Sequence, residues 1–113
     1  MHELSIAGAV VDTALKHAAG RRVTTVTVRA GALRQVVGDS LEFYFGIVTR
    51  DTLCEGARLE LEVVPARLSC CGSEWEVDWP DFRCAACGGA ATVVAGDELE
   101  VESIEVEEAA CTA

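Results

Sequence analysis

Residues 58–89, RLELEVVPARLSCCGSEWEVDWPDFRCAACGG, contain the change of pattern that determines the fold. The first seven of these residues alternate polar and apolar side chains, as a half-buried strand does, and Pro65 ends that strand. Four cysteines and both tryptophans then fall within residues 66–92, where core-forming periodicity is lost. We therefore predict that residues 66–92 form a small module inserted between two strands of an α+β domain.

The part of the chain before this module predicts two helices and a strand. Residues 3–19 have amphipathic helical spacing, with Gly20 as the stop, and residues 23–29 alternate as a strand. A second helix is expected from Asp39, because Asp39 and Glu42 have the spacing of a capping box. The expected buried stripes are Leu4, Ala7, Val11, Leu15 and Ala18 in the first helix, and Leu41, Phe45 and Val48 in the second.

Regular alternation returns after the module, in residues 97–107. Leu99 and Val101 are out of phase with Ile104 and Val106, which predicts a β-bulge near Glu102 and Ser103. The expected fold is α+β: two helices packed on a small three-stranded sheet, with an inserted zinc-ribbon-like cysteine module. The expected domains are a discontinuous α/β domain of residues 1–65 and 93–108, the module of residues 66–92, and a C-terminal tail of residues 109–113.

Composition limits the classes of partner. The 113 residues carry 9 basic and 19 acidic side chains, a formal net charge of −10. Such a charge argues against neutralisation of nucleic-acid phosphates and against a polybasic membrane anchor. No apolar run reaches the roughly 18–20 residues of a membrane span, and no signal-peptide pattern precedes the first helix. We expect a cytoplasmic protein with reduced thiols, either monomeric or weakly dimeric.

The cysteine module predicts a structural zinc site. Cys84-Ala-Ala-Cys87 followed by two glycines is a zinc half-site, because two thiolates at this spacing reach one tetrahedral ion. The other half is irregular: Leu68 stands where a regular half-site has its first cysteine, and Cys70 directly precedes Cys71. We predict Cys71, Cys84 and Cys87 as ligands, with Cys70 swinging in as the fourth through an altered turn. A disulfide or redox-active Cys84–Cys87 pair is the alternative.

The remaining cysteines and histidines are less informative by themselves. Cys54 and Cys111 are remote candidates as zinc ligands, and we expect both thiols to be at least partly exposed. His17 is expected as an exposed helix residue. At the start of the chain, the amine of Met1, the amide nitrogen of residue 2 and the imidazole of His2 can chelate one Ni²⁺ or Cu²⁺ in adjoining rings.

Several segments of the chain form a recognisable series. They are Met1-His2-Glu3-Leu4-Ser5-Ile6, Gly31-Ala-Leu33 with Val36, Ser40-Leu41-Glu-Phe-Tyr-Phe45, Cys84-Ala-Ala-Cys87-Gly, and Gly96-Asp-Glu98-Leu99 followed by Ile104-Glu105-Val106. In this order they resemble the HypA/HybF family of hydrogenase maturation nickel metallochaperones. Together they span about residues 1–107. The family has two Cys-x-x-Cys half-sites, so the Cys70-Cys71 doublet of this chain is a departure from its pattern.

The resemblance implies a carrier and not an enzyme. It implies that Ni²⁺ is held by N-terminal nitrogens of Met1 and by His2, with Glu3 contributing or shaping the site. Asp39, near the start of the second helix, is a weaker candidate, because helix capping also explains it. The implied partners are the GTPase HypB and the precursor of the [NiFe]-hydrogenase large subunit, and some relatives also supply urease.

Two other functions account for parts of the sequence. A zinc-ribbon adaptor for protein interactions, with no transferable metal, explains the cysteine module and leaves His2 incidental. A thiol oxidoreductase using Cys84 and Cys87 explains that pair alone, without the βαβ context typical of such enzymes.

Overall fold

The computed structural model describes residues 3–77 and 83–107. Its first half contains helix α1 (Glu3–Ala18), strand β1 (Val23–Gly31), a short 3₁₀ helix η1 (Ala32–Arg34), helix α2 (Gly38–Val48) and strand β2 (Arg58–Val64). Its second half contains β3 (Ala66–Cys70), β4 (Ser73–Val77), β5 (Thr92–Ala95) and β6 (Leu99–Val106). The predicted order of two helices and three strands around a cysteine module is confirmed.

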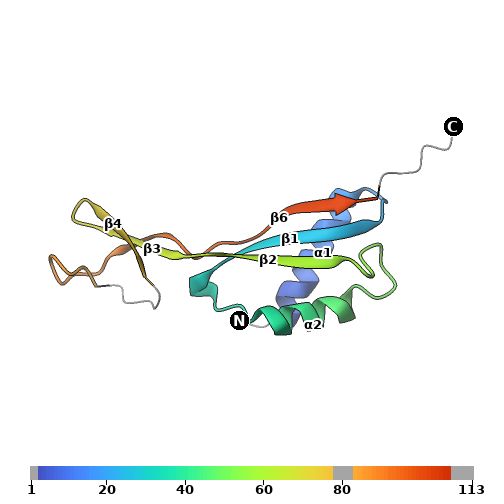
Figure 1. Cartoon of the computed structure of the whole chain (residues 1–113), viewed down its shortest axis with the longest axis horizontal. Coiled ribbons are helices and arrows are strands. Elements are labelled where there is room, and N and C mark those ends of the chain that lie inside the picture. Colours follow the sequence, from blue (N-terminus) through green and yellow to red (C-terminus); the bar gives the residue numbers. More distant parts are fainter. Residues whose placement is uncertain (1–2, 78–82, 108–113) are drawn as a thin grey trace.

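The strands form two separate three-stranded sheets. The first has the order β2-β1-β6 and the second the order β4-β3-β5. Strands β1 and β2 are parallel, so the chain must cross over between them, and α2 is that crossover. The first sheet carries α1 and α2, and the second sheet extends from its end (Figure 1). The predicted module ends at residue 92. Because β5 pairs with β3, the second sheet extends three residues further, to Ala95.

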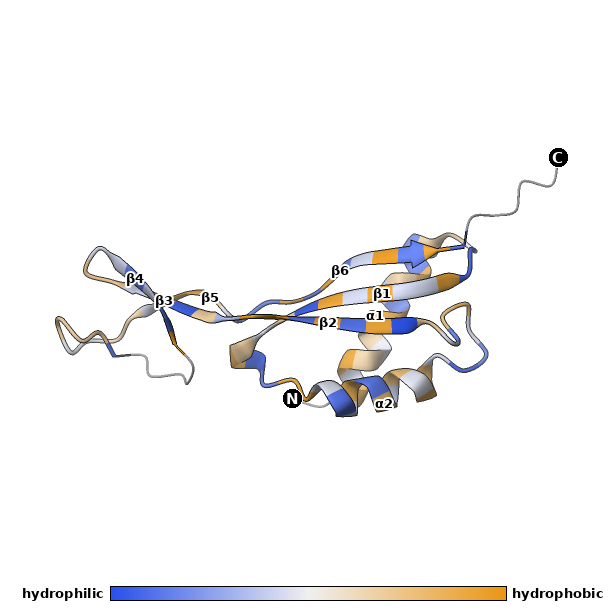
Figure 2. Ribbon diagram, viewed as in Figure 1, coloured by the Kyte–Doolittle hydropathy of each residue, from blue (hydrophilic) through white to orange (hydrophobic). Residues whose placement is uncertain are grey.

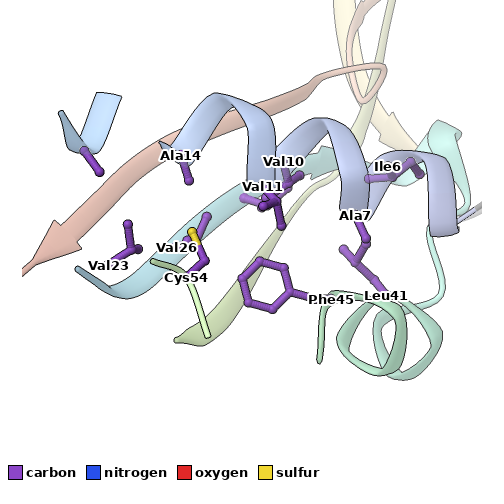
Figure 3. Close-up of a cluster of buried hydrophobic side chains, with 12 residues drawn as sticks. Ile6, Ala7, Val10, Val11, Ala14, Val23, Val26, Leu41, Phe45 and Cys54 are labelled. Carbon is purple, nitrogen blue, oxygen red and sulfur yellow. The ribbon is translucent and has the colours of Figure 1, made fainter. Parts of the chain in front are cut away.

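The hydrophobic core lies between the two helices and the first sheet. Figure 3 shows Ala7 of α1 above Leu41 of α2, with Phe45 and Cys54 beside Val26 of β1. The first helix buries Ile6, Ala7, Val10, Val11, Ala14 and Ala18. The predicted stripe is wrong at Leu4, which is 50% exposed. The buried face is centred on Val10 and Ala14, so Leu4 falls outside it.

Two further predictions are corrected in this domain. Helix α2 begins at Gly38, and its N-cap is Val37, which makes no side-chain capping hydrogen bond. Asp39 is therefore the second helical residue, where its negative charge stabilises the positive end of the helix dipole but does not cap it. Cys54 is fully buried, and burial raises the pKa of its thiol. The expected exposure of Cys54 is wrong because this turn packs into the core.

The predicted bulge in the last strand is confirmed. Thr27 pairs with Ser103 and Val28 pairs with Val101, so Glu102 is the extra residue on β6. The extra residue places the side chains of Val101 and Ile104 on the same face of the sheet, and both pack against the core. Alternating hydrophilic and hydrophobic residues along β2 and β6 are visible in Figure 2. A hydrogen bond with Glu62 raises the pKa of Glu102 on the open face of the sheet.

The two sheets meet where three backbone segments cross. The Gly31 N–H donates to the Glu98 carbonyl at 2.7 Å, and the Leu33 N–H donates to the Gly96 carbonyl at 2.8 Å. A Cβ on Gly31 would lie 2.0 Å from the Gly96 carbonyl carbon, and one on Gly96 would lie 2.5 Å from Ala66 Cα. Only glycine allows backbones to approach this closely.

The turn at Gly96 is fixed by a carboxylate. Glu98 Oε1 accepts a hydrogen bond from the Gly96 N–H at 2.7 Å. Bonds from its own N–H and from that of Gly96 hold the pKa of Glu98 below its usual value. The carboxylate thus satisfies backbone donors that the crossing leaves without a strand partner.

Candidate metal centres

Four thiols gather at one end of the second sheet. The sulfurs of Cys70, Cys71, Cys84 and Cys87 all lie within 4.8 Å of one another. The Cys70 Sγ lies 3.7 Å from that of Cys71 and 3.6 Å from that of Cys87, and the Cys84 Sγ lies 3.9 Å from that of Cys71. A Zn–S bond of about 2.3 Å in a tetrahedral site places neighbouring sulfurs about 3.8 Å apart. The cluster therefore fits a structural zinc ion.

The Cys70-Cys71 doublet is part of a tight hairpin. Cys70 pairs with Ser73 at the end of the β3–β4 ladder, leaving Cys71 and Gly72 as a two-residue turn with φ of 53° and 75°. Positive φ at both residues is the signature of a type I′ turn. Neighbouring side chains in a strand point to opposite faces, but the left-handed conformation of Cys71 brings its thiol to the side of Cys70. The structure thus supplies the altered turn that the sequence required.

Leu68 has a structural reason for its place in β3. It is fully buried and pairs with Trp75 of β4 and Val93 of β5. It therefore occupies the centre of the small second sheet, where a zinc ligand would leave a gap. The hairpin turn, and not the strand, supplies the two thiols of this half of the cluster.

The other half is a compact turn closed by its own backbone. The Cys84 N–H donates to the Gly89 carbonyl at 2.8 Å, and the Gly88 N–H donates to the Cys84 carbonyl at 2.7 Å. The Gly89 N–H also points to the Cys87 sulfur at 3.4 Å. Cysteine residues 84 and 87 are thereby held at the spacing that one ion needs.

The thiols differ in acidity. Hydrogen bonds from the backbone N–H groups of Cys87 and Ala86 lower the pKa of Cys84 to about 7. Contacts with the sulfurs of Cys87, Cys84 and Cys71 raise the pKa of Cys70 to about 12 in the metal-free site. Cys84 is therefore the more readily ionised of these two thiols, and a cation that binds Cys70 would have to displace its proton.

A cavity of about 310 Å³ adjoins the thiols. Ser73, Trp75 and Arg83 line it together with Cys70, Cys71 and Cys84. Ser73, Trp75 and Arg83 were not among the site residues predicted from the sequence. Trp75 could have been predicted to lie near the thiols, because it follows the Cys70-Cys71-Gly72 stretch within a segment that alternates polar and apolar residues.

The candidate nickel residues are only partly described. Met1 and His2, like Cys111, lie outside the described residues. Glu3 is half-buried and is the first residue of α1, while Asp39 is exposed in the first turn of α2. The first turns of the two helices lie at the same end of the domain (Figure 1). His17 is exposed, as predicted, and its Nδ1 lies 2.9 Å from the Thr13 carbonyl.

Comparisons with known proteins agree with this architecture. The family described as "Hydrogenase/urease nickel incorporation, metallochaperone, hypA" matches residues 1–106. The hydrogenase maturation factor HypA of Geobacter metallireducens is 50% identical over 110 residues, which cover 95% of this chain and 100% of that protein. The chain belongs to the HypA family. It is thus a member of a nickel metallochaperone family that serves hydrogenase maturation.

Other HypA proteins extend the comparison. HypA of Geotalea daltonii is 46% identical over 109 residues, covering 94% of this chain and 99% of that protein. The solution structure of the nickel metallochaperone HypA from Helicobacter pylori superposes with a TM-score of 0.71 at 21% identity, covering 94% and 97% of the two chains. At this identity the likeness concerns the fold alone. Within the described residues, no helix is long and apolar enough to cross a membrane.

Proposed function

We propose that this chain is a cytoplasmic nickel carrier that takes up Ni²⁺ at its N-terminus and delivers it during maturation of [NiFe]-hydrogenase. The observation that supports this most strongly is the HypA family match over residues 1–106. The protein acts by binding and release and is not an enzyme. Its partners are a HypB-type GTPase and the precursor of the hydrogenase large subunit.

The nickel ligands in this proposal come from the first three residues. The amine of Met1, the amide nitrogen and imidazole of His2, and the backbone of Glu3 offer nitrogen donors in adjoining chelate rings, which suit square-planar Ni²⁺. Glu3 begins α1, so the chelate would sit directly before a packed helix. Asp39 remains a weaker candidate, since it is exposed in the first turn of α2.

The zinc ligands in this proposal are Cys70, Cys71, Cys84 and Cys87. Four thiolates fill a tetrahedral zinc site, which leaves no open position for water and makes the ion a structural element. Bound there, zinc would join the β3–β4 hairpin to the turn of residues 84–89. The proposed nickel site differs from the zinc site in that its ion can be released. Nitrogen donors at a chain terminus can exchange without unfolding a domain.

The proposed nickel site predicts a strong effect of blocking the amine. A Gly-Ser extension before Met1 should weaken Ni²⁺ binding at least tenfold, since it removes the amine from the chelate. Binding to the unextended protein should also weaken on acidification from pH 8 to pH 6, because the amide and imidazole nitrogens regain protons. Isothermal titration of both proteins, with the N-terminus verified by intact mass, measures these effects. Equal affinity of the two proteins would contradict the proposed ligands.

A further inference from the structure

A groove runs between helix α1 and strand β6. It consists of two cavities, of about 160 and 210 Å³, which both include Thr13 and Val101 in their walls. The first is mostly apolar, with Ile6, Ala9 and Val10 on the helix side and Leu99 on the strand side. Because the two cavities share these wall residues, they lie next to each other along the strand, and together they are called the groove.

The strand beside this groove is the edge of the sheet. β6 pairs with β1 on one side, and the sheet order β2-β1-β6 leaves its other side as an edge. Within residues 3–77 and 83–107, no backbone–backbone hydrogen bond outside the β1–β6 ladder involves Leu99–Val106. The Glu105 carbonyl also accepts a hydrogen bond from Thr24 Oγ1, which comes from the β1 side, at 3.2 Å. An exposed strand edge next to an apolar groove is a site where an extended peptide can add as a further strand.

The bulge at Glu102 limits where such pairing can occur. It interrupts the regular edge of β6, and bulges protect edges from long strand pairing. The regular segment on its N-terminal side, Leu99–Val101, borders the more apolar of the two cavities. A short extended segment is therefore favoured over a long one.

Charge defines the sequence of the segment that would fit. Side chains of an added strand alternate between the two faces. Those on the face of Leu99 and Val101 would enter the groove, where Ala9 and Thr13 leave room for aliphatic groups. Those on the opposite face would lie beside Glu100, whose side chain is 54% exposed and lies 3.5 Å from the Arg29 guanidinium, and near the exposed Glu102 and Glu105. Opposite charges across neighbouring strands stabilise pairing.

We infer that the groove between α1 and β6 binds an extended segment of a maturation partner, in which small aliphatic residues alternate with lysine or arginine. The inference rests on the proposed function only for the identity of the partner, since neither Glu3 nor Asp39, the two candidate nickel residues that the structure describes, lines the groove. Ile6 lies three residues after Glu3 on α1. A segment bound here is therefore held about one helical turn from Glu3.

The direct test uses a fluorescent heptapeptide, Lys-Val-Lys-Val-Lys-Val-Lys with blocked ends, and nickel-free full-length protein at physiological salt. We expect saturable binding by fluorescence anisotropy, with amide chemical-shift changes at Ala9, Thr13 and residues 99–101. A peptide that is N-methylated at alternate residues should bind at least tenfold more weakly, because it cannot pair with a strand edge. Equal binding of the methylated peptide would overturn the inference and indicate charge attraction alone.

Two variants with the same charge change locate the site. Ala9→Arg fills the apolar cavity from an exposed position, whereas Ser5→Arg adds the same charge on α1 outside the groove. We expect at least tenfold weaker peptide binding for Ala9→Arg and less than a twofold change for Ser5→Arg, with circular dichroism unchanged in both. Equal weakening of both would overturn the inference. The inference would also be overturned if the amide chemical shifts of residues 99–101 changed with protein concentration and not with peptide concentration. That result would identify a second copy of the chain as the occupant.

The same titration on His2→Ala protein separates this inference from the nickel proposal. Peptide binding should be unchanged in that variant, because the contacts inferred for the peptide are with residues 6–13 of α1 and residues 99–101 of β6. Loss of nickel binding with peptide binding retained would support both statements. If the wild-type protein binds nickel but does not bind the peptide, the inference about the groove is contradicted and the nickel proposal is not.

Discussion

Replacing Gly31 with alanine will lower the free energy of unfolding by about 2–4 kcal/mol, because the added methyl group meets backbone that cannot move aside. Its Cβ would lie 2.0 Å from both the carbonyl carbon and the carbonyl oxygen of Gly96, and 2.5 Å from the Asp97 nitrogen. The φ of Gly31 is −69°, which alanine adopts easily, so the effect comes from contact and not from backbone conformation. Urea denaturation followed by circular dichroism measures it.

Gly46→Ala is the matched control for this prediction. A Cβ at Gly46 meets nothing within 4 Å, and the residue lies inside α2. Alanine is the better helix former, so this change should stabilise the protein by about 0.5–1 kcal/mol. Opposite signs for the same chemical substitution would show that Gly31 is required by the crossing of the two sheets. A Gly31→Ala protein as stable as the wild type would show that the crossing is looser than described.

Replacing Cys84 with serine will abolish zinc binding and unfold the second sheet. Cys84 is the buried member of the cluster, at 4% exposure, and its thiol has the lowest pKa among the cysteines whose pKa is shifted. Zinc binding to small structural modules contributes about 10–16 kcal/mol of apparent free energy, which is their folding free energy. Zinc stoichiometry should fall from one ion per chain to none, and hydrogen-exchange protection should be lost over residues 66–77 and 92–95.

The α/β domain should survive this substitution. Its core cluster draws on α1, α2, β1 and Cys54, and none of its buried residues comes from the second sheet. Protection in residues 6–48 should therefore persist in the Cys84→Ser protein. Cys54→Ser is the control, because Cys54 is a buried thiol outside the cluster, and this variant should keep its zinc. Zinc loss in both variants would contradict the assignment of the cluster.

The sequence predicted the elements well where a single periodicity extended over several residues. The strand at residues 58–64, the bulge at Glu102 and the first helix all follow from local alternation or helical spacing. The errors arose where tertiary packing decides. Leu4 has the right spacing for a buried stripe, but α2 and the sheet cover a face centred on other residues of α1. Cys54 stands in a polar turn, and only the folded chain shows that this turn packs against the core.

The cysteine cluster shows the same division. Spacing identified the half-site at Cys84 and Cys87, since both ligands lie in one short turn. Spacing did not place Cys70, because the position of its thiol depends on a left-handed residue at Cys71. The burial of Leu68 depends on the pairing of β3 with two other strands, which no local pattern reveals. The groove between α1 and β6 is also a product of tertiary packing, between residues more than 80 positions apart.

The most direct test of the central claim is a Ni²⁺ titration of zinc-loaded, untagged protein with its authentic Met1, compared with His2→Ala. Absorption spectroscopy detects the bands of low-spin square-planar Ni²⁺. We predict one equivalent of diamagnetic nickel in the wild type and loss of this site in His2→Ala, with zinc content unchanged in both. Equal, weak binding by the two proteins would contradict a nickel site at the N-terminus and would favour a zinc-dependent adaptor instead.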